Sequence, residues 1–351
     1  MPTRAVPSLF ALCLRTLWIA PILAFLCRAA AGGVDPAIPA YLPEGPASGT
    51  VSCLGADNMN GILDRWARAL ARIHPGLRLE VARNTRLSAE GLDALLEGRT
   101  QVAPFVREIY PAERRRFLER FGHEPLLVWV AGGSYATKHN THAIAIYVNA
   151  ANPLKGISLG QLERIFSGSA PAPILTWGQL GLSGEWAGRP VRAYGMPRLR
   201  GTGNPPGIVN YFEQRILGGR EFGAGVAEVP DRAGVESLDG IVRAVASDPG
   251  GIGYSGFGNR TGGVRAVPVA EADTGPFVAG TPETVADRTY PLSRQIYLCV
   301  NRLPGQPLSG PIRQLLRYAL SREGQEDIAA DPAGFLPLSA ANALAERAKL
   351  D

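Results

Sequence analysis

Residues 50–74 read Thr-Val-Ser-Cys-Leu-Gly-Ala-Asp-Asn-Met-Asn-Gly-Ile-Leu-Asp-Arg-Trp-Ala-Arg-Ala-Leu-Ala-Arg-Ile-His, and this stretch decides the class of fold. Its first five residues are mostly apolar or β-branched and predict a strand from Thr50 to Leu54. A helix is predicted from about residue 58 to residue 74, where Pro75 and Gly76 end it, because apolar side chains recur at helical spacing: Ile62, Leu63, Trp66, Leu70 and Ile73. A strand that leads through a short loop into a helix is typical of α/β proteins.

The same alternation continues along the chain in both directions. Further strands are predicted at 77–82, 102–105, 126–130, 143–148, 191–194 and 295–300, and further helices at 88–97, 112–121, 159–166, 208–217, 235–247, 311–321 and 323–330. The fold class is therefore α/β with largely parallel sheets. The 351 residues suffice for two compact domains, and a composition of 46% hydrophobic and 19% charged residues excludes a disordered chain.

Residues 1–31 have the pattern of a signal peptide. Arg4 and Arg15 precede an apolar run at 16–27, which is too short to cross a bilayer, and Ala29-Ala30-Ala31 offers a cleavage site. We expect export to the periplasm with maturation near Ala31; an uncleaved anchor, or lipoprotein processing at Cys27, are the alternatives. Loss of three arginines with this segment lowers the formal charge from +5 to +2, which gives no support to a nucleic-acid partner.

After the signal peptide, residues 32–48 are rich in Pro, Gly and Ala and are predicted to be a linker. Only Cys53 and Cys299 remain in the mature chain, each in an apolar strand-like run. In an oxidising compartment they could form one disulfide, and two buried free thiols are an equal alternative. The absence of any Cys-x-x-Cys excludes zinc ribbons and thioredoxin chemistry.

Several motifs resemble known kinds of functional site but lack the neighbouring secondary structure or ligands that those sites need. The glycines of 251–256 match G-x-G-x-x-G, but no strand is predicted before them and no helix after them, so we expect no dinucleotide. His139 and His142 lie in a polar loop without a third ligand, and we interpret them as a surface loop rather than a metal site. Arg114-Arg115-Arg116 alternates with acids and is interpreted as a solvated helix face. We therefore predict no cofactor, no metal and no enzymatic activity.

The informative loops lie directly before helices. Asn58 opens the first long helix, Ser88 opens the second, and residues 198–203 (Arg-Leu-Arg-Gly-Thr-Gly) precede the helix that begins near Ile208. The first N–H groups of a helix lack partners and attract anions, and hydroxyl and guanidinium groups add donors. Each loop alone is usually only a cap, but three of them in an exported two-domain α/β chain favour a cleft that holds a small anion.

These residues resemble the phosphate-binding, type 2 periplasmic solute-binding proteins of ABC transporters. The resemblance spans roughly residues 49–340 and includes Gly55-Ala56-Asp57-Asn58-Met59, Thr141-His142-Ala143-Ile144-Ala145-Ile146, Trp177-Gly178-x-Leu180-Gly181, Tyr290-Pro291-Leu292-x-Arg294 and Ala319-Leu320-Ser321-x-Glu323-Gly324-Gln325. It implies two α/β lobes joined by two hinge strands around a central cleft. Lobe 1 would be residues 49–142 plus 293–345, and lobe 2 residues 143–292. The hinge strands would be 143–148 and the segment near 290–300, and the resemblance modestly favours the disulfide because both cysteines fall in lobe 1.

The resemblance also implies a ligand set, with departures from the family pattern. Asn58 and Met59 replace the usual threonine loop, and Ser88 keeps the serine of a degenerate Gly-Ser-Ser loop that now contains Glu90. Val106-Arg107 replaces Ser-Arg, and the Arg-x-x-x-Ser-Gly-Thr loop becomes Met196 to Thr202. The expected ligand residues are Asn58, Met59, Ser88, Arg107, Arg198, Arg200, Gly201 and Thr202.

The sequence and the resemblance together leave three candidate functions. The first is an exported, monomeric solute-binding protein that captures phosphate or a related oxyanion and delivers it to an ABC permease of the inner membrane. The second is a binding-fold protein that has lost transport and acts as a sensor or scaffold, which the altered ligand loops favour. The third is an exported hydrolase, for which the sequence offers no nucleophile–base pair.

Overall fold

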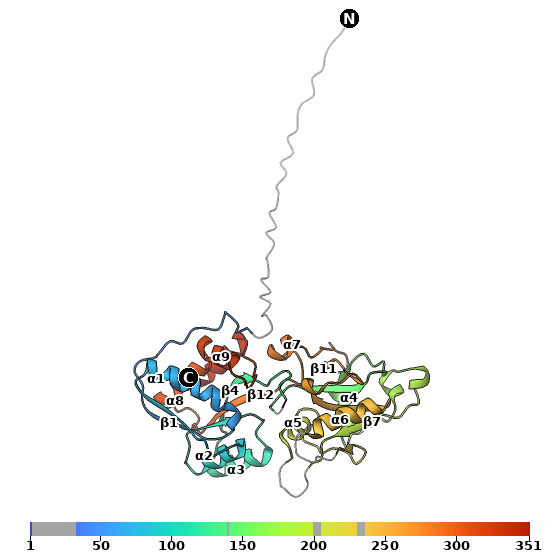
Figure 1. Ribbon diagram of the computed structural model, residues 1–351, viewed down its shortest axis with the longest axis horizontal. Helices are drawn as coiled ribbons and strands as arrows, with labels where there is room; N and C mark the ends of the chain where they lie inside the picture. The colour runs from blue at the N-terminus through green and yellow to red at the C-terminus, as the bar shows by residue number, and fades with distance from the viewer. Residues whose placement is uncertain (2–32, 139, 199–204, 230–235) are drawn as a thin grey trace.

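The computed structural model describes Met1, 33–138, 140–198, 205–229 and 236–351, and the predicted signal peptide lies outside these residues. Two five-stranded sheets, each with its own helices, form two lobes that lie side by side (Figure 1). Within the described residues, no helix combines the length and the apolar character that crossing a membrane requires.

The first lobe contains a sheet with the strand order β2-β1-β3-β12-β4. Its strands are β1 (Ser48–Cys53), β2 (Gly76–Val81), β3 (Val102–Phe105), β4 (Leu126–Gly132) and β12 (Gln295–Val300). Its helices are α1 (Asn60–Ile73), α2 (Ser88–Leu96), α3 (Pro111–Phe121), α8 (Gly310–Ala319), α9 (Arg322–Ala329) and α10 (Ala340–Arg347). Strand β12 comes from the far end of the chain, so this lobe is discontinuous in sequence.

Helix α1 shows why the opening stretch folds as predicted. Ile62, Leu63, Trp66 and Leu70 are buried on one face, while Ile73, at the last turn, is 42% exposed. The Trp66 indole N–H donates to Gly324 O of α9 (3.1 Å), which ties the helix to the C-terminal part of the lobe. The predicted apolar stripe is therefore correct except at its final residue.

The second lobe contains a sheet with the order β10-β5-β9-β7-β8. Its strands are β5 (Ile144–Asn149), β7 (Arg192–Gly195), β8 (Ala227–Glu228), β9 (Gly251–Gly256) and β10 (Val264–Ala266), and a two-stranded sheet joins β6 (Ile157–Ser158) to β11 (Val269–Ala270). Its helices are α4 (Leu159–Phe166), α5 (Gly207–Arg215), α6 (Glu236–Ser247) and α7 (Pro282–Ala286). The prediction of largely parallel sheets is wrong, because β12 runs antiparallel to β3 and β4, and β5 runs antiparallel to β9 and β10.

Strand β9 is the clearest difference from the sequence prediction. Its six residues, Gly-Ile-Gly-Tyr-Ser-Gly, are all buried between β5 and β7. Because glycines are typical of loops, the sequence predicts no strand here. A Cβ on Gly253 would lie 2.6 Å from Cγ2 of Ile241, because α6 packs closely across the strand. The glycine motif therefore lies within a buried strand, where its small residues allow close helix–sheet contact, and no α-helix begins directly after it.

The chain crosses between the lobes twice, and the two crossings hydrogen-bond to each other. The Gly133 N–H donates to Arg294 O (2.8 Å), and the Ile144 N–H donates to Leu292 O (3.0 Å). The strands that the sequence assigns to the hinge, β5 and β12, lie within the sheets of the lobes. The crossing segments are the shorter pieces at 133–143 and near 288–294.

The predicted linker, residues 32–48, is described from residue 33 onward: Ser48 is already the first residue of β1, and 33–47 form no helix or strand but belong to the first lobe. Ile38 and Tyr41 are buried in its core, and the Arg322 guanidinium donates to Ile38 O (3.1 Å). The Tyr41 hydroxyl also contacts the His74 ring nitrogen at 2.8 Å. This segment therefore packs on the lobe rather than extending freely away from it.

Cys53 and Cys299 are free, so the disulfide alternative is wrong. Cys53 pairs in register with Val102 and Cys299 with Ala103, and strand β3 lies between them. Because neighbouring residues of a strand point to opposite faces, the two thiols face different sides of the sheet. They accordingly lie in separate apolar clusters.

We predict that both thiols are unreactive in the native protein. Burial raises the pKa of Cys53 and of Cys299, so neither forms the reactive thiolate at neutral pH. In a chain without residues 1–32, a thiol-specific chromogenic reagent should detect no thiol before denaturation and both thiols in guanidinium chloride. A denatured chain that yields no reactive thiol would show that a disulfide forms after all.

Candidate functional site

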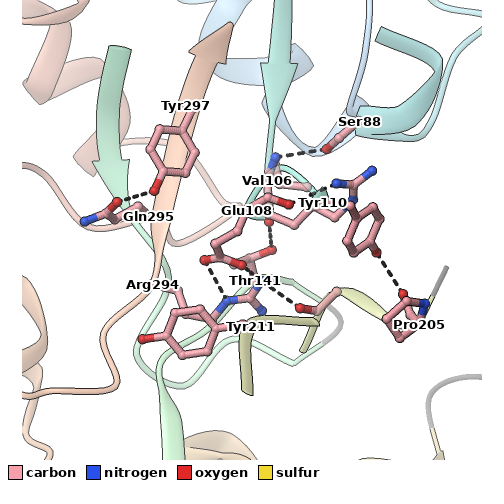
Figure 2. Close-up of polar contacts among 12 residues, drawn as sticks. Ser88, Val106, Glu108, Tyr110, Thr141, Pro205, Tyr211, Arg294, Gln295 and Tyr297 are labelled. Carbon is pink, nitrogen blue, oxygen red and sulfur yellow. Dashed lines mark hydrogen bonds and ion pairs between the residues drawn. The ribbon is translucent and has the colours of Figure 1, made fainter. Parts of the chain in front are cut away.

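The loops that the sequence identifies in lobe 1 meet at one edge of its sheet. Strands β2 and β3 both run parallel to β1, so the loops after their carboxyl ends lie together. Asn58 lies in the turn of 3-10 helix before α1, Ser88 begins α2, and Val106 follows β3. The Val106 N–H donates to Ser88 Oγ (3.2 Å), which joins two of the loops directly (Figure 2).

The first crossing segment is tied to these loops by Asn140 and Thr141. The amides of Asn58 and of the Thr141 backbone both donate to Asn140 Oδ1, at 3.2 and 2.9 Å. The Thr141 hydroxyl donates to Val106 O (Figure 2). A chain of hydrogen bonds thus runs from Asn58 through the crossing to Val106 and Ser88. Neither Asn140 nor Thr141 is among the ligand residues expected from the sequence, although Thr141 lies in one of the stretches that carry the family resemblance and both lie between the two histidines.

His142 is not on the surface, contrary to the prediction for this loop. The residue is 5% exposed, and its ring packs against Gly256 of β9, where a Cβ would lie 2.6 Å from the ring. Burial, helped by the Arg294 charge, lowers the pKa of His142 to about 4, so the imidazole is neutral at physiological pH. His139 lies outside the described residues, and the described part of the chain contains no cluster of metal ligands.

Lobe 2 meets these loops through the start of α5. The Tyr110 hydroxyl donates to Pro205 O (2.9 Å), and the Arg294 guanidinium donates to Glu108 Oε2 at 2.6 Å (Figure 2). Arg294 also contacts Gly207 O at 3.5 Å. Gly207 also packs against Arg107, since a Cβ built on Gly207 would lie 3.4 Å from the Arg107 side chain, which is an ordinary packing distance. The loop after β3 is therefore one place where the two lobes touch.

Arg294 is a buried cation at this junction, with a side chain that is 4% exposed. Burial alone lowers the pKa of Arg294, but the Glu108 carboxylate outweighs burial and the net direction is upward. The Tyr211 ring lies near the guanidinium, with 5.2 Å between its centroid and the guanidinium carbon. The Glu108–Arg294 pair therefore connects the loop after β3 to the second crossing.

Arg107, an expected ligand residue, is already bound by the protein. Its two terminal nitrogens donate to the Glu113 carboxylate at 2.8 and 2.6 Å, and its guanidinium lies 3.8 Å from the centroid of the Tyr110 ring. The two charged side chains are 12% and 4% exposed. This arrangement holds the loop after β3 against α3.

Arg198 is likewise paired within lobe 2. Its Nε lies 3.1 Å from Glu213 Oε1, and it also forms an ion pair with Glu221. Burial raises the pKa of Glu213, and the Arg198 charge opposes that rise. The nearby expected residues Arg200, Gly201 and Thr202 lie outside the described residues.

Met59 contributes packing rather than a donor. Its side chain is fully buried in the core of lobe 1, and its N–H donates to Ala56 O (3.2 Å). The Glu90 carboxylate, which the sequence suggests is unfavourable to an anion, accepts the Arg86 and Leu87 N–H groups at 2.7 Å each. These hydrogen bonds lower the pKa of Glu90. Two backbone donors of the Ser88 loop are thus used by the chain's own carboxylate.

Several neutral donors remain free in the described loops of lobe 1. Ser88 Oγ accepts one hydrogen bond and keeps its proton to donate, and the first N–H groups of α2 have no acceptor within the helix. The Asn58 amide uses one of its two N–H bonds toward Asn140. A hydroxyl, an amide and a helix start form a donor set suited to an anion's oxygens, and lobe 2 must supply the compensating charge.

Comparisons with known proteins fit this arrangement. A family model described as a PBP superfamily domain matches residues 42–323. The phosphate-binding protein PstS of Pseudomonas aeruginosa is 32% identical over 315 residues, which cover 89% of this chain and 90% of that protein.

The crystal structure of PstS from Borrelia burgdorferi matches with a TM-score of 0.53 and 16% identity, covering 83% of this chain and 99% of that one. An ABC-type phosphate transport receptor from Vibrio cholerae matches with a TM-score of 0.50 and 17% identity, covering 82% and 99%. The two structures show likeness of fold.

Glu113→Ala is expected to destabilise the protein by about 3 kcal/mol, because it leaves the Arg107 charge buried without its partner. Urea denaturation followed by circular dichroism measures the change. Glu119→Ala, on the exposed face of the same helix, is the matched control and should change stability by less than about 0.5 kcal/mol. Equal stability of the two variants would contradict a structural role for the Arg107–Glu113 pair.

Proposed function

Since this chain belongs to the PBP superfamily and, within it, to the family of the phosphate-binding protein PstS, we propose that it captures phosphate, or a related small oxyanion, between its two lobes. The observation that carries the proposal is the 32% identity to the Pseudomonas aeruginosa protein over 89% of this chain. The donor set at Ser88 and Asn58 supports it, because hydroxyl and amide protons suit phosphate oxygens.

The proposed mechanism is binding without covalent chemistry. The two lobes would close on the anion, with Ser88, Asn58 and the start of α2 on one side and the loop of Arg200, Gly201 and Thr202 on the other. Arg107 and Arg198 would hold these loops in place through their carboxylate partners. The loaded protein would act in the periplasm and deliver the anion to an ABC permease; the names of the relatives describe binding and transport, and we assign no catalytic step.

A specific observation favours keeping the second candidate, a binding-fold protein without transport. Glu90 occupies two backbone donors of the Ser88 loop, and Arg107 is held by Glu113. Isothermal titration calorimetry with phosphate separates the two candidates. Saturable heat supports the transport reading, and the absence of heat with phosphate and with other oxyanions would favour the sensor or scaffold.

Ser88→Ala should weaken phosphate binding by roughly 10- to 100-fold, because a hydrogen bond to a charged group contributes about 1.5–3 kcal/mol. Ser309→Ala is the control, since Ser309 precedes α8 on the exposed surface and its side chain makes no capping hydrogen bond. Calorimetry gives both dissociation constants, and unchanged affinity in the Ser88 variant would remove this loop from the site.

Arg200→Ala and Arg198→Ala are expected to have opposite signatures. The Arg200 variant should lose roughly tenfold or more in phosphate affinity at unchanged melting temperature, because a charge-assisted contact to the anion is removed. The Arg198 variant should melt earlier, because it leaves Glu213 buried without its cation, while affinity stays within about threefold. If instead Arg198→Ala abolishes binding at unchanged stability, Arg198 is the ligand residue.

A further inference from the structure

A cavity of about 220 Å³ lies at the second crossing, between the two lobes. Tyr211 and Arg215 of α5 form its wall in lobe 2, Gln295 and Tyr297 of β12 form its wall in lobe 1, and Tyr290 lines it from the crossing itself. Neither Asn58 nor Ser88 lines this cavity. It is therefore a space separate from the donors assigned to phosphate.

The charges around the cavity are paired with one exception. Arg215 forms an ion pair with Glu271, and Glu108 is bound by Arg294. Arg288 lines the same cavity, and no group in the described part of the chain accepts a hydrogen bond from its guanidinium or forms an ion pair with it. Among the charged side chains that line the cavity, Arg288 is therefore the one without an ion-pair partner in the described part of the chain.

The described side chains around Arg288 contact its guanidinium but do not form an ion pair with it. Its guanidinium carbon lies 3.7 Å from the centroid of the Trp129 ring, a cation–π contact. The Glu346 carboxylate, whose charge also acts on Arg288, accepts hydrogen bonds from the Lys349 ammonium (2.7 Å) and from the backbone N–H of Trp129 (3.0 Å). The Arg288 residue is exposed to solvent over part of its surface, and partial burial of its side chain lowers the pKa of Arg288.

The backbone at Arg288 is in an unfavourable conformation. Its φ is 67°, and among the described residues no other non-glycine residue has a positive φ. A glycine would adopt this conformation without the steric cost that a Cβ brings. Strained residues that persist are concentrated at sites where the strain places a functional group. Here the strained residue is the one unpaired cation of the cavity.

The other lining groups complement a carboxylate with an apolar body. The Tyr297 hydroxyl donates to Gln295 Oε1 (Figure 2), which leaves the NH₂ group of the Gln295 amide as a donor among the residues that line the cavity with Arg288. The rings of Tyr211 and Tyr290, together with Pro291, supply apolar surface. A cavity of about 150 Å³ can hold benzene, so this one has room for a molecule of about that size with a carboxylate added.

We propose that this cavity at the second crossing is a second binding site. It would bind a small organic carboxylate whose negative charge pairs with the Arg288 guanidinium. The carboxylate would accept hydrogen bonds from the planar guanidinium and from the Gln295 amide, with its apolar body against the tyrosine rings. Both lobes and the crossing line the cavity, so the ligand would contact the parts of the chain that any change of lobe angle must move.

Benzoate is the probe, and benzyl alcohol is its neutral counterpart. The purified protein should bind benzoate at millimolar concentration with saturable heat, and benzyl alcohol at least about tenfold more weakly. The emission of Trp129 should change with the same midpoint, because Arg288 lies over its ring. No saturable binding, or equal binding of the two probes, overturns the proposal. Heat without a change in Trp129 emission, identified with Trp129→Phe, places the ligand elsewhere and also overturns it.

Arg288→Gly is the decisive variant, because it removes the guanidinium and relieves the backbone strain together. It should fold, melt no earlier than the wild type, and bind benzoate at least about tenfold more weakly. Arg78→Ala, an exposed cation of β2, is the matched control and should bind benzoate normally. Undiminished benzoate binding by Arg288→Gly overturns the proposal.

Phosphate separates this proposal from the proposed function. Arg288→Gly should keep phosphate affinity within about twofold, and phosphate should not compete with benzoate. If the variant loses both ligands, or if phosphate displaces benzoate, the cavity is part of the anion site and the second site does not exist. Failure of benzoate to bind leaves the calorimetry with phosphate unaffected.

Discussion

The insertion of β12 between β3 and β4 is the constraint on which the rest of the structure depends. The strand returns from the second lobe and pairs antiparallel with both neighbours, so the sheet of the first lobe closes only after the chain has built the whole second lobe. The crossings that this requires are hydrogen-bonded to each other at Gly133–Arg294 and Ile144–Leu292. The lobes are consequently joined by a pair of short adjoining segments rather than by a flexible tether.

That return strand begins with a buried charge that must be satisfied. Arg294 lies at the entry to β12, and Glu108 from the loop after β3 supplies its carboxylate. The Arg107–Glu113 pair fixes that same loop. The junction of the lobes therefore depends on two ion pairs, Glu108–Arg294 and Arg107–Glu113, and the loop after β3 supplies one partner of each. Burying charges in this way is costly for stability, but it fixes the position of the loop that also carries the Val106 contact to Ser88.

Much of the fold follows from local patterns, and its exceptions have physical causes. Helix α1 is predicted because its apolar spacing reports which face is buried, and strand β5 because an unbroken apolar run is typical of a strand buried on both faces. Strand β9 is missed because close packing by α6 replaces side chains with glycine, which erases the pattern. The disulfide could not be decided from sequence either, since it depends on β3 separating Cys53 from Cys299, and strand order is a non-local property.

The candidate site is less predictable than the fold, because a cation's role depends on whether a carboxylate reaches it. Arg107 and Arg198 look like anion ligands in sequence, yet Glu113 and Glu213 bind them in the structure. The reverse holds at Arg288, which has no distinguishing sequence context and is left unpaired in a cavity by folding. Composition and motif can count the arginines of such a chain, but the number available to a ligand is set by partners that tertiary structure brings to them. The carboxylates of such a protein therefore decide which of its arginines can meet a ligand.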